Sequence, residues 1–201
     1  MSMLLDRRTL LASFGVSWWS MQRVLASEPI GEVTTARGEC YAQIHSQRRE
    51  LASAANLFLG DAVNTGVQSA LTMRLGAATE VKLGAEAQLR IDRFIVNAGG
   101  VLVLERGGML YDHGPNAGAS DVTVRGPFGL VAVRGTRFFA GPSNGVFGVF
   151  VERGVVMVVG VNTAVVVAEG QGTNLAGPGA EPTLPAPWGA ARIASAMASV
   201  N

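Results

Sequence analysis

The chain has 201 residues, of which 48% are apolar and 15% charged, with 26 glycines. It is long enough for one domain with a substantial core and too apolar to be disordered. A net charge of +1 does not provide the broad basic surface that nucleic-acid binding needs, so no nucleic-acid partner is expected. The single cysteine, Cys40, excludes an internal disulfide and a cysteine-based zinc site, and we expect a buried, unreactive thiol.

Residues 1–26 predict a cleaved export signal. Arg7 and Arg8 precede an apolar segment that is well short of the roughly 20 residues that span a bilayer. Val24-Leu25-Ala26 offers the side chains of a cleavage site, so we expect cleavage after Ala26, a periplasmic location and no stable membrane span in the mature chain. A retained membrane anchor is the alternative.

The two adjacent arginines suggest a particular export route. The run Asp6-Arg7-Arg8-Thr9-Leu10-Leu11 resembles the twin-arginine signal, although Asp6 stands where Ser or Thr is usual. The general secretory route remains the alternative. Removal of residues 1–26 leaves a mature chain of net charge −1.

Residues 27–175 predict a single all-β domain. Short alternating segments, Met73 to Leu75, Val81 to Leu83 and Leu89 to Ile91, recur every eight residues. Alternation with a period of two predicts strands with one buried face. Short strands at regular spacing favour a β-solenoid-like, wrapped sheet, with a β-sandwich as the alternative.

Turn signals divide the second half of this domain. Asn144-Gly145 predicts a tight hairpin turn with positive φ, and Glu152-Arg153-Gly154 predicts a second hairpin. The stretch from Tyr111 to Ser120 is rich in Gly, Asn and Pro and predicts a surface loop with an exposed His113.

Residues 176–201 predict a Pro-rich linker followed by a short terminal helix. Prolines stand at 178, 182, 185 and 187, and Ile193, Met197 and Val200 follow at helical spacing. We expect this helix to pack on the β domain; a helix that docks a partner is the alternative.

Several motifs occur in a fixed order along the chain. They are Leu59-Gly60-Asp61, Leu89 to Asp92, Pro127 to Phe138 with Arg134-Gly135-Thr136, Val151 to Val156, and Glu169-Gly170-Gln171-Gly172. From residue 31 to residue 175 this series resembles the FecR-domain family, whose members are periplasmic sensor and regulator domains of bacteria. Gly126 replaces the family's usual Thr before Pro127.

The resemblance implies a non-catalytic domain that takes part in signalling. In well-known members the domain follows a transmembrane helix, receives a signal from an outer-membrane transporter and controls a cytoplasmic sigma factor. Only about eight residues precede the apolar segment here. We therefore expect a free-standing periplasmic form that does not control a sigma factor directly, and that binds another envelope protein.

The motif residues Gly60, Asp61, Arg134, Gly135, Thr136, Gly154 and Gly170 are predicted to stabilise the fold rather than to bind a ligand. In Arg134-Gly135-Thr136 the glycine allows a bulge or a close backbone approach, and the arginine and threonine can satisfy backbone groups. Replacement of Arg134 by Ala should lower the thermal stability.

No catalytic, metal or phosphate-binding motif is present, so neither an enzyme nor a cofactor is expected. His45 and His113 lie far apart, and Asp61, Glu86 and Asp92 at strand ends are expected to be solvated. We keep two alternatives to a periplasmic binding or signalling module. One is an envelope structural protein that oligomerises through sheet edges, and the other is a carbohydrate-active enzyme with converging carboxylates.

Overall fold

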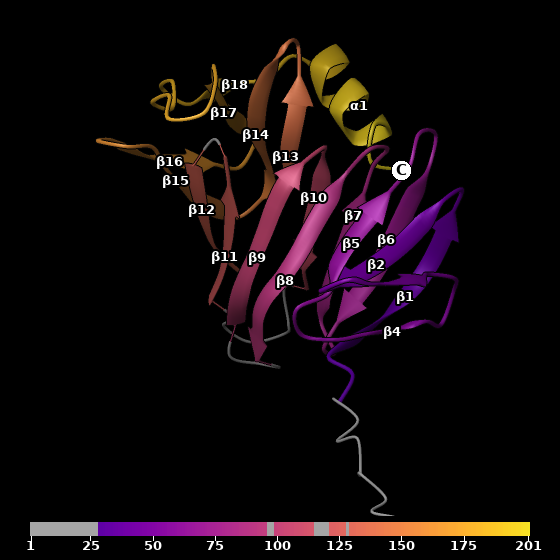
Figure 1. Cartoon of the computed structure of the whole chain (residues 1–201). Helices are drawn as coiled ribbons and strands as arrows, with labels where there is room; N and C mark the ends of the chain where they lie inside the picture. The colour runs from indigo at the N-terminus through magenta and orange to yellow at the C-terminus, as the bar shows by residue number, and fades with distance from the viewer. Residues whose placement is uncertain (1–27, 96–98, 115–120, 128) are drawn as a thin grey trace, which may run out of the picture.

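The computed structural model describes residues 28–95, 99–114, 121–127 and 129–201, with the backbone alone at 121, 130 and 132–134. Arg7, Arg8 and Ala26 of the expected export signal therefore lie outside the described residues. Within the described ranges the protein is nearly all β, with the short helix α1 (Ala190–Ala198) near the C-terminus (Figure 1). No helix in these ranges has the length and apolarity that a membrane span requires.

The strands of the described ranges form two open sheets of nine strands each. In spatial order, sheet A contains β18 (Ala186–Pro187), β17 (Gln171–Leu175), β14 (Val146–Arg153), β13 (Arg137–Ser143), β10 (Met109–His113), β7 (Thr79–Leu83), β6 (Ala70–Leu75), β1 (Gly31–Arg37) and β4 (Asn56–Leu57). Sheet B contains β16 (Ala164–Ala168), β15 (Val155–Val159), β12 (Gly129–Arg134), β11 (Asp121–Gly126), β9 (Gly99–Arg106), β8 (Gln88–Ile95), β5 (Ala62–Thr65), β2 (Cys40–Ile44) and β3 (Gln47–Glu50).

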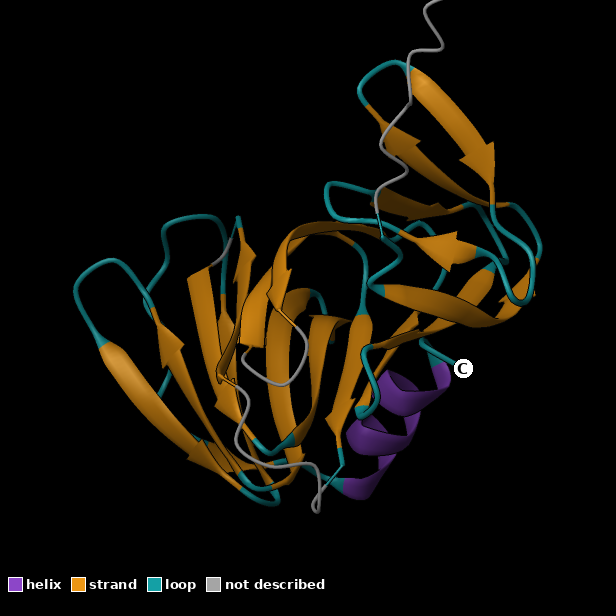
Figure 2. Ribbon diagram, turned by 90° about the horizontal axis from the view of Figure 1, so that it is seen from below, coloured by secondary structure: helices purple, strands orange, loops and turns teal. Residues whose placement is uncertain are grey.

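The chain passes from one sheet to the other after every one or two strands, so both sheets grow in the same direction along the molecule. Neighbouring strands pair antiparallel except β9 and β11, which are parallel. Figure 2 shows that the row of strands does not close into a barrel. The arrangement is sandwich-like, the alternative that the sequence left open, because the parallel stacking of a β-helix type of solenoid is limited to one strand pair.

A single apolar cluster fills the space between the sheets. Alternate residues of sheet A, such as Met73, Val81 and Phe138, meet alternate residues of sheet B, such as Leu89 and Leu102. Cys40 belongs to this cluster, and burial raises the pKa of its thiol, as the expectation of an unreactive cysteine requires. The period-two pattern in the sequence therefore marks the faces that form this core.

The C-terminal helix covers the outer face of sheet A. Trp188 stacks on Phe150, with ring centroids 5.2 Å apart, and Ala196 and Val200 of the tail are buried against the same cluster. Glycine at Gly148 leaves room for the indole, because a Cβ there would lie 2.6 Å from Trp188. The terminal helix thus packs on the β domain, as expected from its apolar spacing.

The linker and the helix that follows it both make hydrogen bonds to the β domain. In α1, Arg192 lies 3.5 Å above the Trp188 ring and donates to Ser143 Oγ at 3.0 Å and to Asn174 Oδ1 at 2.6 Å. In the linker, the Thr183 N–H donates to the Asn174 carbonyl of β17 at 3.0 Å. Glu181 accepts hydrogen bonds from the backbone and side chains of Asn162 and Thr163 in the β15–β16 turn. The segment between β17 and α1 is therefore attached to both sheets.

The two predicted hairpins have different outcomes. Asn144 and Gly145 have φ of 52° and 78° and connect the antiparallel strands β13 and β14, so this hairpin is confirmed. The hairpin predicted at Glu152-Arg153-Gly154 is wrong: β14 belongs to sheet A and β15 to sheet B, and the two do not pair. With a φ of 89°, Gly154 turns the chain around the corner of the sandwich instead.

The surface loop predicted for Tyr111 to Ser120 is also wrong at its start. Met109–His113 forms β10 in the middle of sheet A, between β7 and β13, and both Tyr111 and His113 are buried. The turn-rich composition therefore begins after the strand, and residues 115–120 lie outside the described part of the chain.

Candidate functional site

The Gly60-Asp61 motif closes a tight turn. Gly60 has a φ of 89°, and the Asp61 backbone N–H donates to the Phe58 carbonyl at 3.1 Å. Asp61 Oδ2 accepts from the Phe58 N–H at 2.9 Å and from Arg49 at 2.7 Å. Asp61 is buried, so the expectation of a solvated carboxylate is wrong here, whereas Glu86 and Asp92 are exposed. The carboxylate binds its own turn and an arginine from β3.

Gly135, Thr136 and Gly154 meet at one end of the sandwich. Gly135 has a φ of 60°, and the fully buried Thr136 follows it and accepts at its carbonyl from the His113 N–H at 3.0 Å. A Cβ at Gly154 would lie 2.7 Å from Thr136 Cγ2 and 3.3 Å from the Gly135 carbonyl oxygen. The two motifs, apart in sequence, are therefore in direct contact.

The other two predicted motif residues have simpler surroundings. Arg134 ends β12, where its backbone is paired with Asp121, and its side chain lies outside the described part of the structure. Gly170 has a φ of 78° in the turn between β16 and β17, and its N–H donates to the Val151 carbonyl at 2.9 Å. Nothing lies within 4 Å of a Cβ built on Gly170.

A charged cluster that the sequence did not suggest lies beside Thr136. Asp112 accepts from Arg137 and from Arg153 at 2.7 Å each, and Arg137 also pairs with Glu152 at 2.5 Å. Burial acts to raise the pKa of Asp112, but the hydrogen bonds and charges of the two arginines outweigh it, so the pKa lies below its usual value. Only the strand register brings these residues together, since Arg137 is opposite both Asp112 and Arg153.

A buried polar group lies next to this cluster. The Thr79 hydroxyl lies 3.0 Å from His113 Nδ1. Burial raises the pKa of the neighbouring Tyr111 to about 12, although its interaction with the Thr79 side chain lowers that pKa. A hydroxyl next to an imidazole is the arrangement of a nucleophile and its general base. Here, however, Thr79 and His113 are both buried, on the adjacent strands β7 and β10. These side chains therefore connect β7 and β10 and are shielded from a substrate in solution.

The opposite end of the sandwich is open. There the end of β9, Pro127 after β11, the β13–β14 turn and the segment after β17 surround a groove of about 600 Å³. Leu104 and Phe147 form its apolar floor, its rim carries Pro127, Pro142 and Pro178, and Glu105 and Arg106 stand on one side. This volume lies within the range of small-molecule and peptide-side-chain sites.

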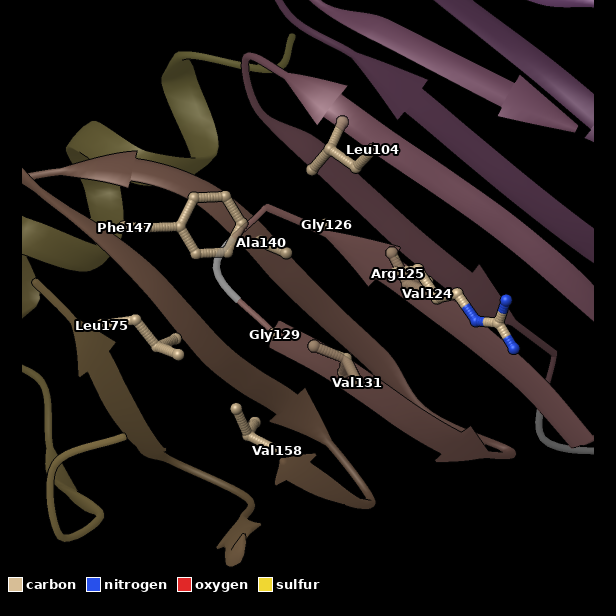
Figure 3. A pocket seen from close by; sticks show the side chains of 10 residues that line it. All are labelled: Leu104, Val124, Arg125, Gly126, Gly129, Val131, Ala140, Phe147, Val158 and Leu175. Carbon is tan, nitrogen blue, oxygen red and sulfur yellow. The ribbon is translucent and has the colours of Figure 1, made fainter. Parts of the chain in front are cut away.

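The groove narrows sharply towards the core. Figure 3 shows the gap between the sheets below it, lined by side chains such as Val124, Val131 and Leu175. Leu104 and Phe147 line both spaces, but the inner gap has a volume of only about 10 Å³, roughly that of one water. A ligand of the groove would therefore lie at the surface and not inside the sandwich.

The described residues offer no group of three His, Cys, Asp or Glu side chains arranged to hold a metal ion. Two pairs of carboxylates share an arginine: Asp112 and Glu152 both bind Arg137, and Asp92 and Glu105 both bind Arg90. At Asp112 the two arginines favour the ionised form and hold its pKa below the usual value, which does not suit a proton donor.

Comparison with known proteins shows that part of the chain is similar to a described family. Residues 61–157 match the family described as FecR protein, a span that includes Asp61, Thr136 and Gly154 but not Gly60 or Gly170. The match thus lies inside the longer range suggested by the motifs. No curated protein matches the chain.

Two solved structures share the fold. Both are crystal structures of a protein from Parabacteroides distasonis titled "putative anti-sigma factor", with a TM-score of 0.55 and 16% sequence identity over 67% of this chain. The aligned part covers 63% and 62% of those chains, so this protein corresponds to less than two thirds of their length. At this identity the likeness concerns the fold.

Proposed function

Starting from the FecR domain at residues 61–157, we propose that this protein is an exported, non-catalytic signalling module that binds another protein of the cell envelope in the periplasm. The family match is the observation that carries the proposal, because FecR-like proteins are regulatory and interact with other proteins. The fold shared with a protein titled as an anti-sigma factor supports the same class of function.

The open groove is the surface that best suits a protein partner. Its floor of Leu104 and Phe147 is apolar, and its proline rim restrains the surrounding backbone. Apolar side chains of a partner segment would be buried on this floor, while Glu105 and Arg106 provide polar contacts at the side. The motif residues at the other end of the sandwich bind one another and stabilise the domain.

Site-specific photo-crosslinking in the cells that produce the protein tests this proposal. A photoreactive residue at Val146 on the groove rim should capture one envelope protein, whereas the same residue at the exposed Gln43 of β2 should not. Deletion of the gene should then change the transcription of a defined set of genes. Identical products from both positions would contradict the groove as the binding site, and an unchanged transcriptome would contradict the signalling role.

The export route has a separate test. If the signal is of the twin-arginine type, Arg7→Lys together with Arg8→Lys should leave folded precursor in the cytoplasm, because the pathway requires the arginine pair. Cell fractionation with detection of the uncleaved chain measures this. Unchanged export of the double variant would instead assign the chain to the general secretory route.

A further inference from the structure

The four outer edges of the two sheets are not protected in the same way. The edge strands of sheet A, β4 and β18, have two residues each. At one edge of sheet B, β3 is Gln-Arg-Arg-Glu, and its arginines pair with Glu39 and Asp61. Proteins commonly protect sheet edges by making them short or charged. The fourth edge, β16, is a five-residue strand of sequence Ala-Val-Val-Val-Ala and has neither protection.

The hydrogen-bonding groups on the free side of β16 can be identified. In the β15–β16 turn the Gly160 N–H donates to the Thr163 carbonyl at 2.8 Å, so these two groups face each other across the hairpin, whereas the Thr163 N–H donates to Glu181 Oε2. Hydrogen-bonded and non-hydrogen-bonded pairs alternate along antiparallel strands, and the register here is unbroken. The backbone groups of Ala164, Val166 and Ala168 therefore point away from β15. The Ala168 N–H agrees with this, since it donates to Gln171 Oε1 at 3.3 Å.

The outer face beside this edge is apolar and exposed. Val155 and Met157 of β15 and Val166 of β16 are 52%, 43% and 62% exposed. The register places Val166 directly opposite Met157, so their side chains are neighbours. On sheet A the corresponding outer apolar residues are covered by Trp188 and α1. No helix of the described ranges lies on β15 and β16.

We propose that β16 pairs with β16 of a second copy of this chain, antiparallel and about a two-fold axis at Val166. The strand reads Ala164-Val165-Val166-Val167-Ala168 in either direction, so the pairing places each Ala164 opposite Ala168 and each Val165 opposite Val167. A two-fold interface requires this self-complementarity. Residues 154–168 contain no charged side chain, so no like charges meet at the axis.

The pairing gives hydrogen-bond partners to the backbone groups of Val166 that point away from β15. The Val166 N–H and carbonyl of each copy bond to those of the other copy, and the two sheets B become continuous. Val167, which is buried between the sheets, would then pack against Val165 of the other copy on the core-facing side of the joined sheet. The two strips of Val155, Met157 and Val166 come to lie side by side on the outer face, which removes apolar surface from water.

A dimer joined by short edge strands buries less area than a standard interface of about 1,600 Å², so we expect reversible association in the micromolar range. Sedimentation velocity of the protein, purified in the form that the cell produces, should show a monomer–dimer equilibrium between about 1 and 200 µM. In the proposed dimer, Glu169 of one copy lies opposite Thr163 of the other copy, and that Thr163 binds Glu181. Added salt should therefore strengthen the dimer, because it screens the repulsion between Glu169 of one copy and Glu181 of the other.

Matched lysine variants test the site. Val166→Lys places two like charges at the axis and should raise the dissociation constant about tenfold or more. Val161→Lys introduces the same charge at a 68% exposed turn residue outside the strand and should leave the constant unchanged. A monomer throughout the concentration range, or a dimer that Val166→Lys leaves intact, would overturn the proposal. If the protein stays monomeric, the β16 edge would instead be available to a strand of another protein.

Disulfide crosslinking tests the register. Residues of a hydrogen-bonded antiparallel pair have Cα atoms about 5.5 Å apart, within the range that a disulfide spans. Val166→Cys should therefore form a covalent dimer on mild oxidation and Val161→Cys should not, while the buried Cys40 does not interfere. Efficient crosslinking of Val161→Cys, with none at Val166→Cys, would show that the copies associate through another surface. Neither experiment depends on the groove or its partner.

Discussion

The close contact between Gly154 and Thr136 allows a quantitative prediction of how a side chain at Gly154 would change the stability. Gly154 has a φ of 89°, a conformation that costs a residue with a Cβ about 1–2 kcal/mol. A Cβ at this position would also lie 2.7 Å from Thr136 Cγ2. Thr136 is fully buried, so its methyl group is surrounded by packed atoms, and such overpacking costs about 1–3 kcal/mol.

The substitution Gly154→Ala should therefore destabilise the protein by about 2–5 kcal/mol, the sum of the two costs. In a domain of this size that corresponds to a fall in melting temperature of roughly 5–20 °C. Gly145→Ala is the matched control, because Gly145 has a φ of 78° but no atom within 4 Å of a built Cβ. It should show the backbone cost alone, about 1–2 kcal/mol.

Thermal unfolding followed by circular dichroism measures both variants. The combination of Gly154→Ala with Thr136→Ser removes the methyl group in question and should recover part of the lost stability. Equal losses for Gly154→Ala and Gly145→Ala, or no recovery in the combined variant, would refute the steric argument.

Three further predictions concern other parts of the chain. Because the pKa of Asp112 is depressed, its stabilising contribution is present above the unfolded pKa near 4 and is lost as the pH falls below it. Asp112→Asn should thus cost about 1–2 kcal/mol at pH 7 and flatten the acid side of the stability profile in urea titrations; an unchanged profile would contradict this. Trp188→Ala removes the ring that holds α1 on sheet A and should cost about 2–4 kcal/mol, with limited proteolysis cutting first in the tail and not in the strands. Cys40 should resist iodoacetamide at pH 8 in the native protein and react in urea, and rapid native labelling would show that the thiol is not buried.

Local sequence signals predicted those features of the fold that local geometry decides. The period-two segments around Met73 and Leu89 are strands, Asn144-Gly145 is a hairpin turn, and the apolar spacing near Ile193 belongs to a helix. In each case the signal and the structure it predicts lie within a few residues of each other. No knowledge of strand pairing was needed.

The errors arose where partners are distant in sequence. Glu152-Arg153-Gly154 has the residues of a hairpin, but a glycine with positive φ suits a corner between sheets equally well, and pairing decides between them. Asp61 at a strand end looks solvated until the register brings Arg49 within 2.7 Å. The cluster around Asp112 could be found only once β10, β13 and β14 were known to be neighbours.

The roles that we propose for the two ends of the sandwich differ, and measurements of stability alongside binding distinguish them. At the motif end the charged and polar groups bind one another, so Gly154→Ala should reduce folding and partner binding in the same proportion. At the groove and along β16 the apolar surface has no counterpart in the described chain. Substitutions such as Val146→Glu or Val166→Lys should then weaken one interaction each at an unchanged melting temperature, because they alter the surface and leave the core intact. If the family motif acted through direct contact with a partner instead, substitutions around Gly154 would weaken binding more than they weaken folding.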